Sequence, residues 1–341
     1  MKSFENICKM TQSEVKRYMY KFLTNNQYNV VDQDGFLYAK GTVPVLLVAH
    51  MDTVHKEQCK AIIKNDNKLS SPQGIGGDDR CGIFIIMNIV KELNCSVLLC
   101  EDEEIGCIGA HKFIDAKRRY TDENGKEIEV RYIDELGVNY MVELDRRGNN
   151  DAVFYSCGNN EFIDFVEDST NFKFAYGSTS DISVLMPEAK LSAVNLSCGY
   201  YNAHTVGEYV MYDEMMDTVE VAKALIKQEC DKPFEYIKKT YKFCGSSVSY
   251  EKPYVRGHYY MASEDEYYNN LLDTPPMNSV TPLSQVAIND TSLELEVVIY
   301  GNDLSEKTLL ATGETKAECW MNLFLENTNL CFNDIVDYSW G

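Results

Sequence analysis

Four short apolar segments, each of strand length, constrain the fold of this chain more than any other feature. Residues 43–50 read VPVLLVAH, a continuous apolar run typical of a strand that is covered on both faces. Similar runs follow, and they alternate with segments of helical periodicity. The expected strands are 43–50, 96–100, 139–145 and 191–197, and the expected helices are 11–23, 82–93, 160–170 and 213–228. Buried strands that alternate with helices predict an α/β fold, a three-layer sandwich with a central, largely parallel mixed sheet.

The last third of the chain has a different texture. A chain of 341 residues exceeds the usual size of one domain, so a second, smaller domain is expected. Residues 231–285 are rich in Tyr, Pro, Ser and Asn. The elements expected beyond them are strands 292–300 and 307–312 and a helix whose capping box is formed by Thr315 and Glu318. We therefore divide the chain into a larger α/β domain, residues 1–228, and a small C-terminal α+β appendage, residues 229–341.

The appendage contains a Tyr-rich segment, residues 250–270, with six tyrosines. Tyrosine offers a large rigid surface with a polar tip, and exposed tyrosines are common in protein contacts. Three roles stay open for this segment: a lid over a site, a contact in a homo-oligomer, or packing under a loop in a small core.

The charge and the cysteines restrict the partners and the compartment. A net charge of −21 argues against binding to nucleic acids or anionic membranes, which need clustered cations. No run of 18 apolar residues exists, so no membrane span is expected. The N-terminus MKSFENICKM is too polar for a signal peptide. The twelve cysteines lie singly, without a CxxC pair, which favours reduced thiols in a cytoplasmic protein.

Polar motifs follow the predicted strands at the point where each strand ends. In chain order these are HMDTV with His50 and Asp52, GIGGDDRCG with Asp78, EDEE at 101–104, ELD with Asp145, and GYYNAHTVGE with His204. Taken alone, three of these motifs have plain alternatives: a polar turn, a capped helix start and a solvated acidic turn. Carboxyl ends of parallel strands meet at one edge of a sheet. Two imidazoles and several carboxylates at that edge would suit a divalent ion such as zinc.

In this order, HMDTV, GGDDRCG, EDEEIGCIGA, ELD and AHT resemble the motifs of the co-catalytic dinuclear zinc exopeptidases. That group includes leucyl-type aminopeptidases, tripeptidases of the peptidase T kind and glutamate carboxypeptidases. The resemblance covers roughly residues 35–228 and leaves the appendage unexplained.

The resemblance implies a role for each of seven residues. The implied metal ligands are His50 and Asp145 for one ion, His204 and Glu104 for the other, and Asp78 as the bridge between them. The implied general base is Glu103, and Asp52 would hydrogen-bond the imidazole of His50. In the family, the peptide bond after the bridging aspartate is often cis.

These residues suggest a reaction. Zinc lowers the pKa of bound water from ~15.7 to roughly 7, so a water bridging two ions becomes a nucleophile near neutral pH. Glu103 would take the proton of that water and deliver it to the leaving amine. We expect a metal-dependent exopeptidase acting on short peptides, first of all an aminopeptidase, with two divalent ions of zinc, cobalt or manganese per chain.

Two other function classes stay open. One is a metal-dependent amidase or deacylase of N-acyl amino acids, or a carboxypeptidase, from the same superfamily. The other is a metal-binding assembly protein that has lost its activity, against which the presence of Glu103 argues.

Some features depart from the family or fall outside its motifs. The short spacing from Asp145 to His204 leaves no room for the inserted domain of the carboxypeptidase and tripeptidase branch. Residues 177–181, GSTSD, resemble loosely the small-residue loop beside the substrate. Arg146 and Arg147 could hold a substrate carboxylate or form a surface ion pair. The histidines that fit no part of the constellation, and are expected to be structural or exposed, are His55, His111 and His258.

Overall fold

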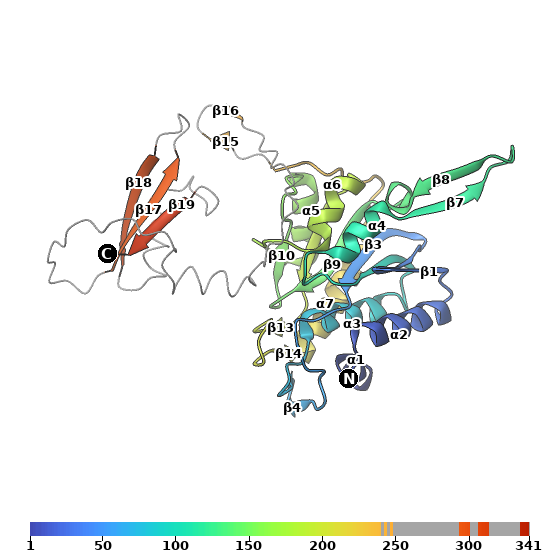
Figure 1. The fold of residues 1–341 in the computed structure, drawn as a ribbon, viewed down its shortest axis with the longest axis horizontal. Coiled ribbons are helices and arrows are strands. Elements are labelled where there is room, and N and C mark those ends of the chain that lie inside the picture. Colours follow the sequence, from blue (N-terminus) through green and yellow to red (C-terminus); the bar gives the residue numbers. More distant parts are fainter. Residues whose placement is uncertain (240–241, 244–245, 248–292, 301–305, 314–334, 341) are drawn as a thin grey trace. The chain divides into compact units, whose positions relative to one another are not determined.

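The computed structural model describes residues 1–239, 242–243, 246–247, 293–300, 306–313 and 335–340 (Figure 1). The chain divides into two compact units, of which the first contains residues 1–239 and the second contains the described residues beyond 241. Among the helices of these residues, none is both long enough and apolar enough to cross a membrane.

The first unit is built on an eight-stranded mixed sheet. Its strands, in spatial order, are β1 (Val30–Gln33), β2 (Phe36–Ala39), β6 (Cys95–Cys100), β3 (Val43–His50), β9 (Tyr140–Arg146), β12 (Ala193–Ser197), β10 (Asp151–Val153) and β11 (Lys173–Ala175). The four central strands β6, β3, β9 and β12 run parallel. On one side β2 is antiparallel to β6, and on the other side β10 is antiparallel to β12. The predicted α/β fold with a central, largely parallel mixed sheet is confirmed.

The central strands are buried on both faces, as their apolar runs predict. β6 is buried along its whole length, and β3 is buried from Val45 to His50. Successive side chains of a strand point to opposite faces, so both faces must be covered. The helices that cover them are α1 (Lys2–Cys8), α2 (Gln12–Asn25), α3 (Gly77–Ile89), α4 (Ile108–Asp115), α5 (Asn160–Thr170), α6 (Asp181–Ala189) and α7 (Tyr212–Ile226).

The helices form one layer on each face of the sheet. α3 packs on β3 and β9 and contacts α1 and α7, whereas α4 and α6 pack together and contact central strands. Figure 1 shows α4 and α6 on the opposite side of the sheet from α3 and α7. The capping box predicted at the start of α2 is present, because Glu14 N–H donates to Thr11 Oγ1 and Thr11 N–H donates to Glu14 Oε2.

Two smaller sheets complete the first unit. One is four-stranded, in the order β13 (Tyr200–Tyr201), β14 (Tyr209–Met211), β5 (Lys68–Ser70) and β4 (Ile63–Asn65). The other is a projecting ribbon of β7 (Lys117–Thr121) and β8 (Glu127–Arg131), followed by the 3-10 helix η1 (Tyr132–Glu135). Neither was predicted from the sequence, since their strands are short and lack a continuous apolar run.

The segment after α7, up to residue 239, packs on the rest of the first unit. Phe234 is buried, and its ring contacts Tyr140 of β9 and Phe162 of α5. The N–H of Ser192 donates to the carbonyl of Phe234, and the N–H of Gly158 donates to that of Ile237. Residues up to 239 therefore share hydrogen bonds and core contacts with the sheet.

A chain truncated after Lys239 should be more stable than one truncated after Gln228. The longer fragment keeps Phe234 in the core, and burying a phenylalanine side chain contributes about 1.5–3 kcal/mol. Urea unfolding of the two fragments measures the difference. Equal free energies of unfolding would show that residues 229–239 add nothing to the stability of the first unit.

The second unit contains a three-stranded antiparallel sheet. β17 (Leu293–Tyr300) lies between β18 (Glu306–Gly313) and β19 (Ile335–Trp340). The two short strands β15 (Lys242–Phe243) and β16 (Ser246–Ser247) form a separate two-stranded sheet. β17 and β18 confirm the two predicted strands. The helix predicted from Thr315 and Glu318 and the Tyr-rich segment 250–270 lie outside the described residues. Their roles, and the domain boundary after residue 228, stay predictions.

Candidate metal centre

The carboxyl ends of three central strands meet at one edge of the sheet. His50, the last residue of β3, pairs in register with Cys100, the last residue of β6. Residues 101–104 therefore leave the sheet beside His50. β9 runs parallel on the other side of β3 and brings Asp145 to the same edge. In open α/β sheets this edge is where ligands bind.

The glycine-rich turn before α3 adds Asp78 to this edge. Gly76 has φ 67°, a conformation that favours glycine. Gly82 lets α3 approach β9 closely, because a Cβ there would lie 1.8 Å from the carbonyl oxygen of Leu144. The peptide bond between Asp78 and Asp79 is cis, as the resemblance implies.

A first group of ligand atoms comes from His50, Asp78 and Asp145, and they lie within 4.8 Å of one another. The Nε2 atom of His50 is 3.0 Å from Asp78 Oδ1 and 3.5 Å from Asp145 Oδ1. Two hydroxyl groups orient the Asp145 carboxylate: Ser180 Oγ donates to Oδ2 and Tyr200 OH donates to Oδ1, both at 3.2 Å. These are the residues that the resemblance assigns to one ion.

A second group consists of Asp78, Glu104 and His204, again within 4.8 Å. The Nε2 atom of His204 is 2.9 Å from Asp78 Oδ2 and 3.2 Å from Glu104 Oε1. Asp78 thus belongs to both groups, and each of its oxygens faces a different imidazole. This is the arrangement that a bridging carboxylate requires.

Asp52 accepts hydrogen bonds from residues of both groups. Its Oδ1 accepts hydrogen bonds from His50 Nδ1 at 3.1 Å and from Glu103 N–H at 3.0 Å, and its Oδ2 accepts from Glu104 N–H at 3.1 Å. Burial opposes ionisation here, but His50 and the two amides outweigh it and hold the pKa of Asp52 below its ordinary value. Asp52 therefore turns His50 so that Nε2 faces the centre, and it fixes the turn that carries both glutamates.

Glu103 lies at the same centre but belongs to neither of these two groups. Its ligand atom lies within 4.8 Å of those of His50 and Glu104. Burial, together with the nearby carboxylates of Asp145 and Asp181, raises the pKa of Glu103 well above its ordinary value. A carboxyl group with an elevated pKa at a reactive centre can accept and return a proton.

The protein atoms alone leave this centre incomplete. Glu104 Oε1 is buried and accepts no hydrogen bond, although His204 Nε2 lies 3.2 Å away. Burial and the charge of Asp78 raise the pKa values of Glu104 and of Asp145, the latter to about 7. Cations between the carboxylates would relieve this repulsion and give the orphaned oxygen a partner. Two imidazoles with carboxylate oxygens form a donor set suited to zinc, cobalt or manganese.

Metal binding should release protons from the metal-free protein. Burial lowers the pKa of His204, but Asp78 and Glu104 outweigh it and raise the pKa to about 11. Asp145 and Asp52 likewise overcome the burial of His50 and raise its pKa well above the ordinary value. Both imidazoles are therefore protonated at neutral pH and must lose a proton to bind an ion, so apparent zinc affinity should rise with pH. Calorimetry of zinc binding in buffers of different ionisation enthalpy measures the number of protons released. We expect about two protons or more, and a value of zero would contradict this prediction.

Other sequence candidates lie at or outside the centre. Arg146 forms an ion pair with Asp151 at 3.1 Å, which agrees with the ion-pair alternative. Of the loop 177–181, Ser180 reaches Asp145, and Asp181 is fully buried. His111 lies on α4 outside both groups, and His258 lies outside the described residues.

The sequence prediction missed several residues that support the centre. Tyr200 lies in β13, just before the loop of His204, and could have been suspected from its place in the motif GYYNAHTVGE. Glu208 ends that motif and makes contacts with the turn before α3. Glu143 is buried two residues before Asp145, and burial with the charge of Asp145 raises its pKa well above the ordinary value.

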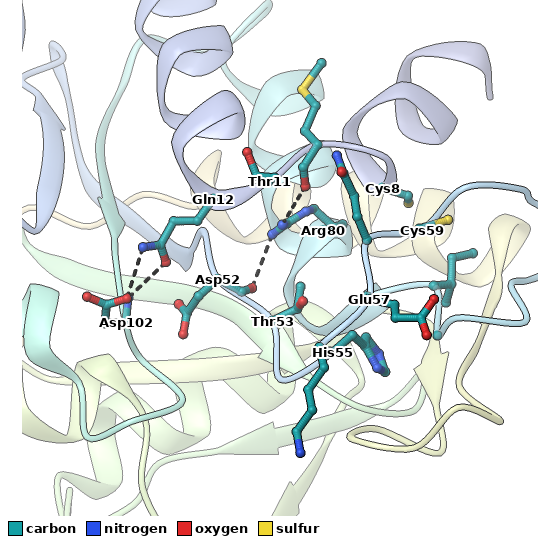
Figure 2. A pocket seen from close by; sticks show the side chains of 16 residues that line it. Cys8, Thr11, Gln12, Asp52, Thr53, His55, Glu57, Cys59, Arg80 and Asp102 are labelled. Atoms are coloured by element: carbon teal, nitrogen blue, oxygen red, sulfur yellow. Dashed lines mark hydrogen bonds between the residues drawn. The ribbon is translucent and has the colours of Figure 1, made fainter.

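A cavity of ≈ 340 Å³ lies beside Asp52, between the loop after β3, the turn before α3 and the start of α2 (Figure 2). Arg80, which is 3% exposed, lines it. The Nη1 of Arg80 donates to the carbonyl oxygens of Met51 and Asp52, and its Nη2 donates to that of Met10. The guanidinium therefore fastens the loop that carries Asp52 to the first turn of α3.

Comparison with known proteins gives a structural match only. No family model and no curated protein sequence matches the chain. An aminopeptidase PepT from Bacillus cereus ATCC 10987 matches with a TM-score of 0.51 at 14% identity, over 66% of this chain and 96% of that one. An aminopeptidase from the archaeon Desulfurococcus kamchatkensis matches with a TM-score of 0.48 at 12% identity, over 67% and 94%. The resemblance inferred from the motifs is thus confirmed at the level of the fold.

Proposed function

We propose that this chain is a dinuclear metallo-aminopeptidase that removes the amino-terminal residue of short peptides. The observation that carries the proposal is the shared carboxylate of Asp78, whose two oxygens face two imidazoles, with Glu103 beside them. The fold shared with an aminopeptidase supports it. We propose His50, Asp78, Glu104, Asp145 and His204 as ligands of two divalent ions, with zinc first.

The residues of the chain have separate tasks in this reaction. Bound divalent ions would lower the pKa of a water and polarise the substrate carbonyl. Glu103 accepts the proton of the attacking water and returns it to the leaving amine. Asp52 holds the amide of Glu103, so the base is positioned by the same carboxylate that orients His50. Ser180 and Tyr200 hold Asp145 by its two oxygens.

The charges near the centre favour a free amino end over a free carboxylate. The net charge of −21 favours the approach of a cationic amino end over that of an anionic carboxylate by long-range steering. A carboxypeptidase needs a cation for the substrate carboxylate. Two arginines close to the proposed ligands in sequence are engaged within the protein, Arg80 by three main-chain carbonyls and Arg146 by Asp151.

Exposed apolar side chains flank the proposed ligands in sequence. Near Asp52, Val54 is 38% exposed. Next to the proposed ligand Glu104, Ile105 is 71% exposed, and two residues after His204, Val206 is 72% exposed. An apolar side chain of the substrate would bury part of this surface. We therefore expect peptides with apolar first residues to be better substrates than peptides with acidic ones.

The compartment and partners are also part of the proposal. The nine cysteines of residues 1–239 are free, and eight of them are buried, as expected for a cytoplasmic protein. The net charge of −21 disfavours nucleic acids and anionic membranes as partners. A homo-oligomer contact through the C-terminal appendage stays part of the proposal.

The test is a panel of short peptides with free and blocked ends, assayed after measuring the zinc, cobalt and manganese bound per chain. We expect about two ions per chain and cleavage that requires a free amino end. Tolerance of a blocked amino end with a required free carboxylate would point to the carboxypeptidase or acyl-amino-acid branch. Metal without turnover on any substrate would favour a binding protein, and absence of bound metal would overturn the proposal.

A further inference from the structure

Glu208 is a fully buried carboxylate that none of the proposed catalytic steps uses. It is 0% exposed and lies four positions after His204, on the same loop. Its Oε2 accepts hydrogen bonds from Gly76 N–H at 2.8 Å and from His55 Nε2 at 2.7 Å, and its Oε1 accepts from Asp78 N–H at 3.0 Å. Both oxygens are thus occupied by donors from other segments.

Two of these donors belong to the turn that delivers the shared carboxylate. The amides of Gly76 and Asp78 point at one carboxylate, which sets the direction of the backbone immediately before the Asp78 side chain. The turn is moulded closely around this group. A Cβ at Gly77 would lie 3.3 Å from Glu208 Oε1 and 2.8 Å from Tyr200 Cβ.

His55 ties a third segment to the same point. It follows His50 and Asp52 on the loop after β3 and lines the cavity beside Asp52 (Figure 2). A Cβ at Gly74 would lie 2.3 Å from the His55 ring, so the turn accepts only glycine against this imidazole. His55 therefore packs on the turn while it donates to Glu208.

Three segments that carry proposed ligands thus meet at Glu208. His55 lies on the loop after β3, the strand that ends at His50. The turn at the start of α3 carries Asp78, and the loop between β13 and β14 carries both His204 and Glu208. We infer that Glu208 and His55 are positioning residues that hold Asp78 between the two imidazoles. The inference rests on the proposed metal centre, and it adds that both ion sites depend on one pair of residues outside the ligand set.

Glutamine at position 208 tests the inference with almost no change in shape. Both carboxylate oxygens accept backbone N–H groups, so the amide NH₂ of glutamine must face an N–H wherever it lies. The turn must then shift, and Asp78 with it. Loss of a partner that orients a ligand commonly lowers metal affinity about 10–100-fold. We expect Glu208→Gln to weaken both zinc ions by this factor, because Asp78 serves both.

The measurement is competition for zinc with a chromophoric chelator, using the full chain after metal removal. The matched control is Glu167→Gln, because Glu167 Oε1 also accepts a backbone N–H, that of Phe174, at 3.0 Å. The control should bind zinc like the wild type. Unchanged affinities in Glu208→Gln would overturn the inference while leaving the proposed function intact.

A second pair of variants tests His55. Glutamine can still donate to Glu208 Oε2 and should keep most of the zinc affinity, whereas leucine cannot donate and should lose about 10–100-fold. If His55 only fills space, His55→Gln and His55→Leu should lose equal amounts of zinc affinity. That result would contradict a positioning role.

Hydrogen exchange separates failure of this inference from failure of the proposed function. In the metal-free protein, amides of residues 74–79 should exchange faster in Glu208→Gln than in Glu167→Gln, because their acceptor is lost. If the wild type binds no zinc, the proposed function fails, and this exchange still decides the inference. Equal exchange in the two variants would then reject it.

Discussion

Replacing Glu103 with glutamine should remove nearly all peptidase activity and leave the metal content unchanged. Glutamine keeps the shape of the side chain and the hydrogen bond from its own amide to Asp52, but it cannot accept a proton. Loss of a general base typically lowers kcat about 10²–10⁴-fold. Steady-state kinetics on a good peptide substrate, together with metal analysis of the same preparation, measures both quantities.

The matched control is Glu101→Gln, from the same run of four acids. Glu101 pairs with Lys16 at 2.6 Å and accepts the N–H of Gly35, so it lies in the fold and outside the centre. This variant should keep its activity. Since Glu103 also lies within ligand distance of His50 and Glu104, loss of one ion in Glu103→Gln would reassign it as a ligand. Full activity with full metal would leave the reaction without its proposed base.

The elements that the sequence predicted well are those with strong local signals. β3 has the predicted bounds 43–50, because its apolar run begins after one turn and ends at a polar motif. α5 has the predicted bounds 160–170, because Asn159 caps its start and Asn171 ends it in a left-handed conformation. For α3 the prediction began at Gly82, whereas the structure begins it at Gly77. Asp78 and Asp79 there have non-helical φ and ψ, which is the reason the helical pattern was visible only from Gly82 onward.

Elements held together by tertiary contacts were not predicted. α6 contains Pro187 and begins in a loop of small residues, so its sequence does not read as a helix. α6 exists because its buried residues, such as Ile182 and Leu185, pack against α4 and the central strands. The strands β10 and β11 have three residues each, too few for a periodic pattern.

The same distinction applies to the centre. His50 and Asp145 lie at the carboxyl ends of strands and Glu104 follows the end of another, so the sheet brings them together once its order is known. The contact between His55 and Glu208 spans 153 positions and joins two loops, so no local pattern announces it. The sequence alone does not distinguish a buried glutamate on a loop from an exposed one. The role of Glu208 follows only from the backbone amides that surround it in the structure.

The supporting contacts converge on Asp78, so we expect a large effect from substitution at this position. Asp52 orients His50 toward it, Glu208 holds its backbone amide, and Arg80, two residues further along α3, fastens the loop of Asp52. Each of these contacts acts on one side of the centre. The carboxylate of Asp78 alone is common to both proposed ion sites among the described residues.

Asparagine at position 78 should therefore abolish activity and weaken both ions, an effect well beyond the roughly 10–100-fold loss expected for a supporting partner. One of its two terminal atoms becomes an NH₂ group, which cannot bind a cation and which faces an imidazole in either orientation. The ion site that faces the NH₂ group loses a ligand. The other ion site keeps an oxygen ligand but loses the negative charge of the carboxylate. Asp145→Asn, which belongs to one group only, should lose one ion and keep the other. Zinc analysis of the two variants beside Asp217→Asn, an exposed position on α7, separates these outcomes. Two tightly bound ions in Asp78→Asn would show that the centre has no bridging carboxylate at this position, and the dinuclear assignment would have to be abandoned.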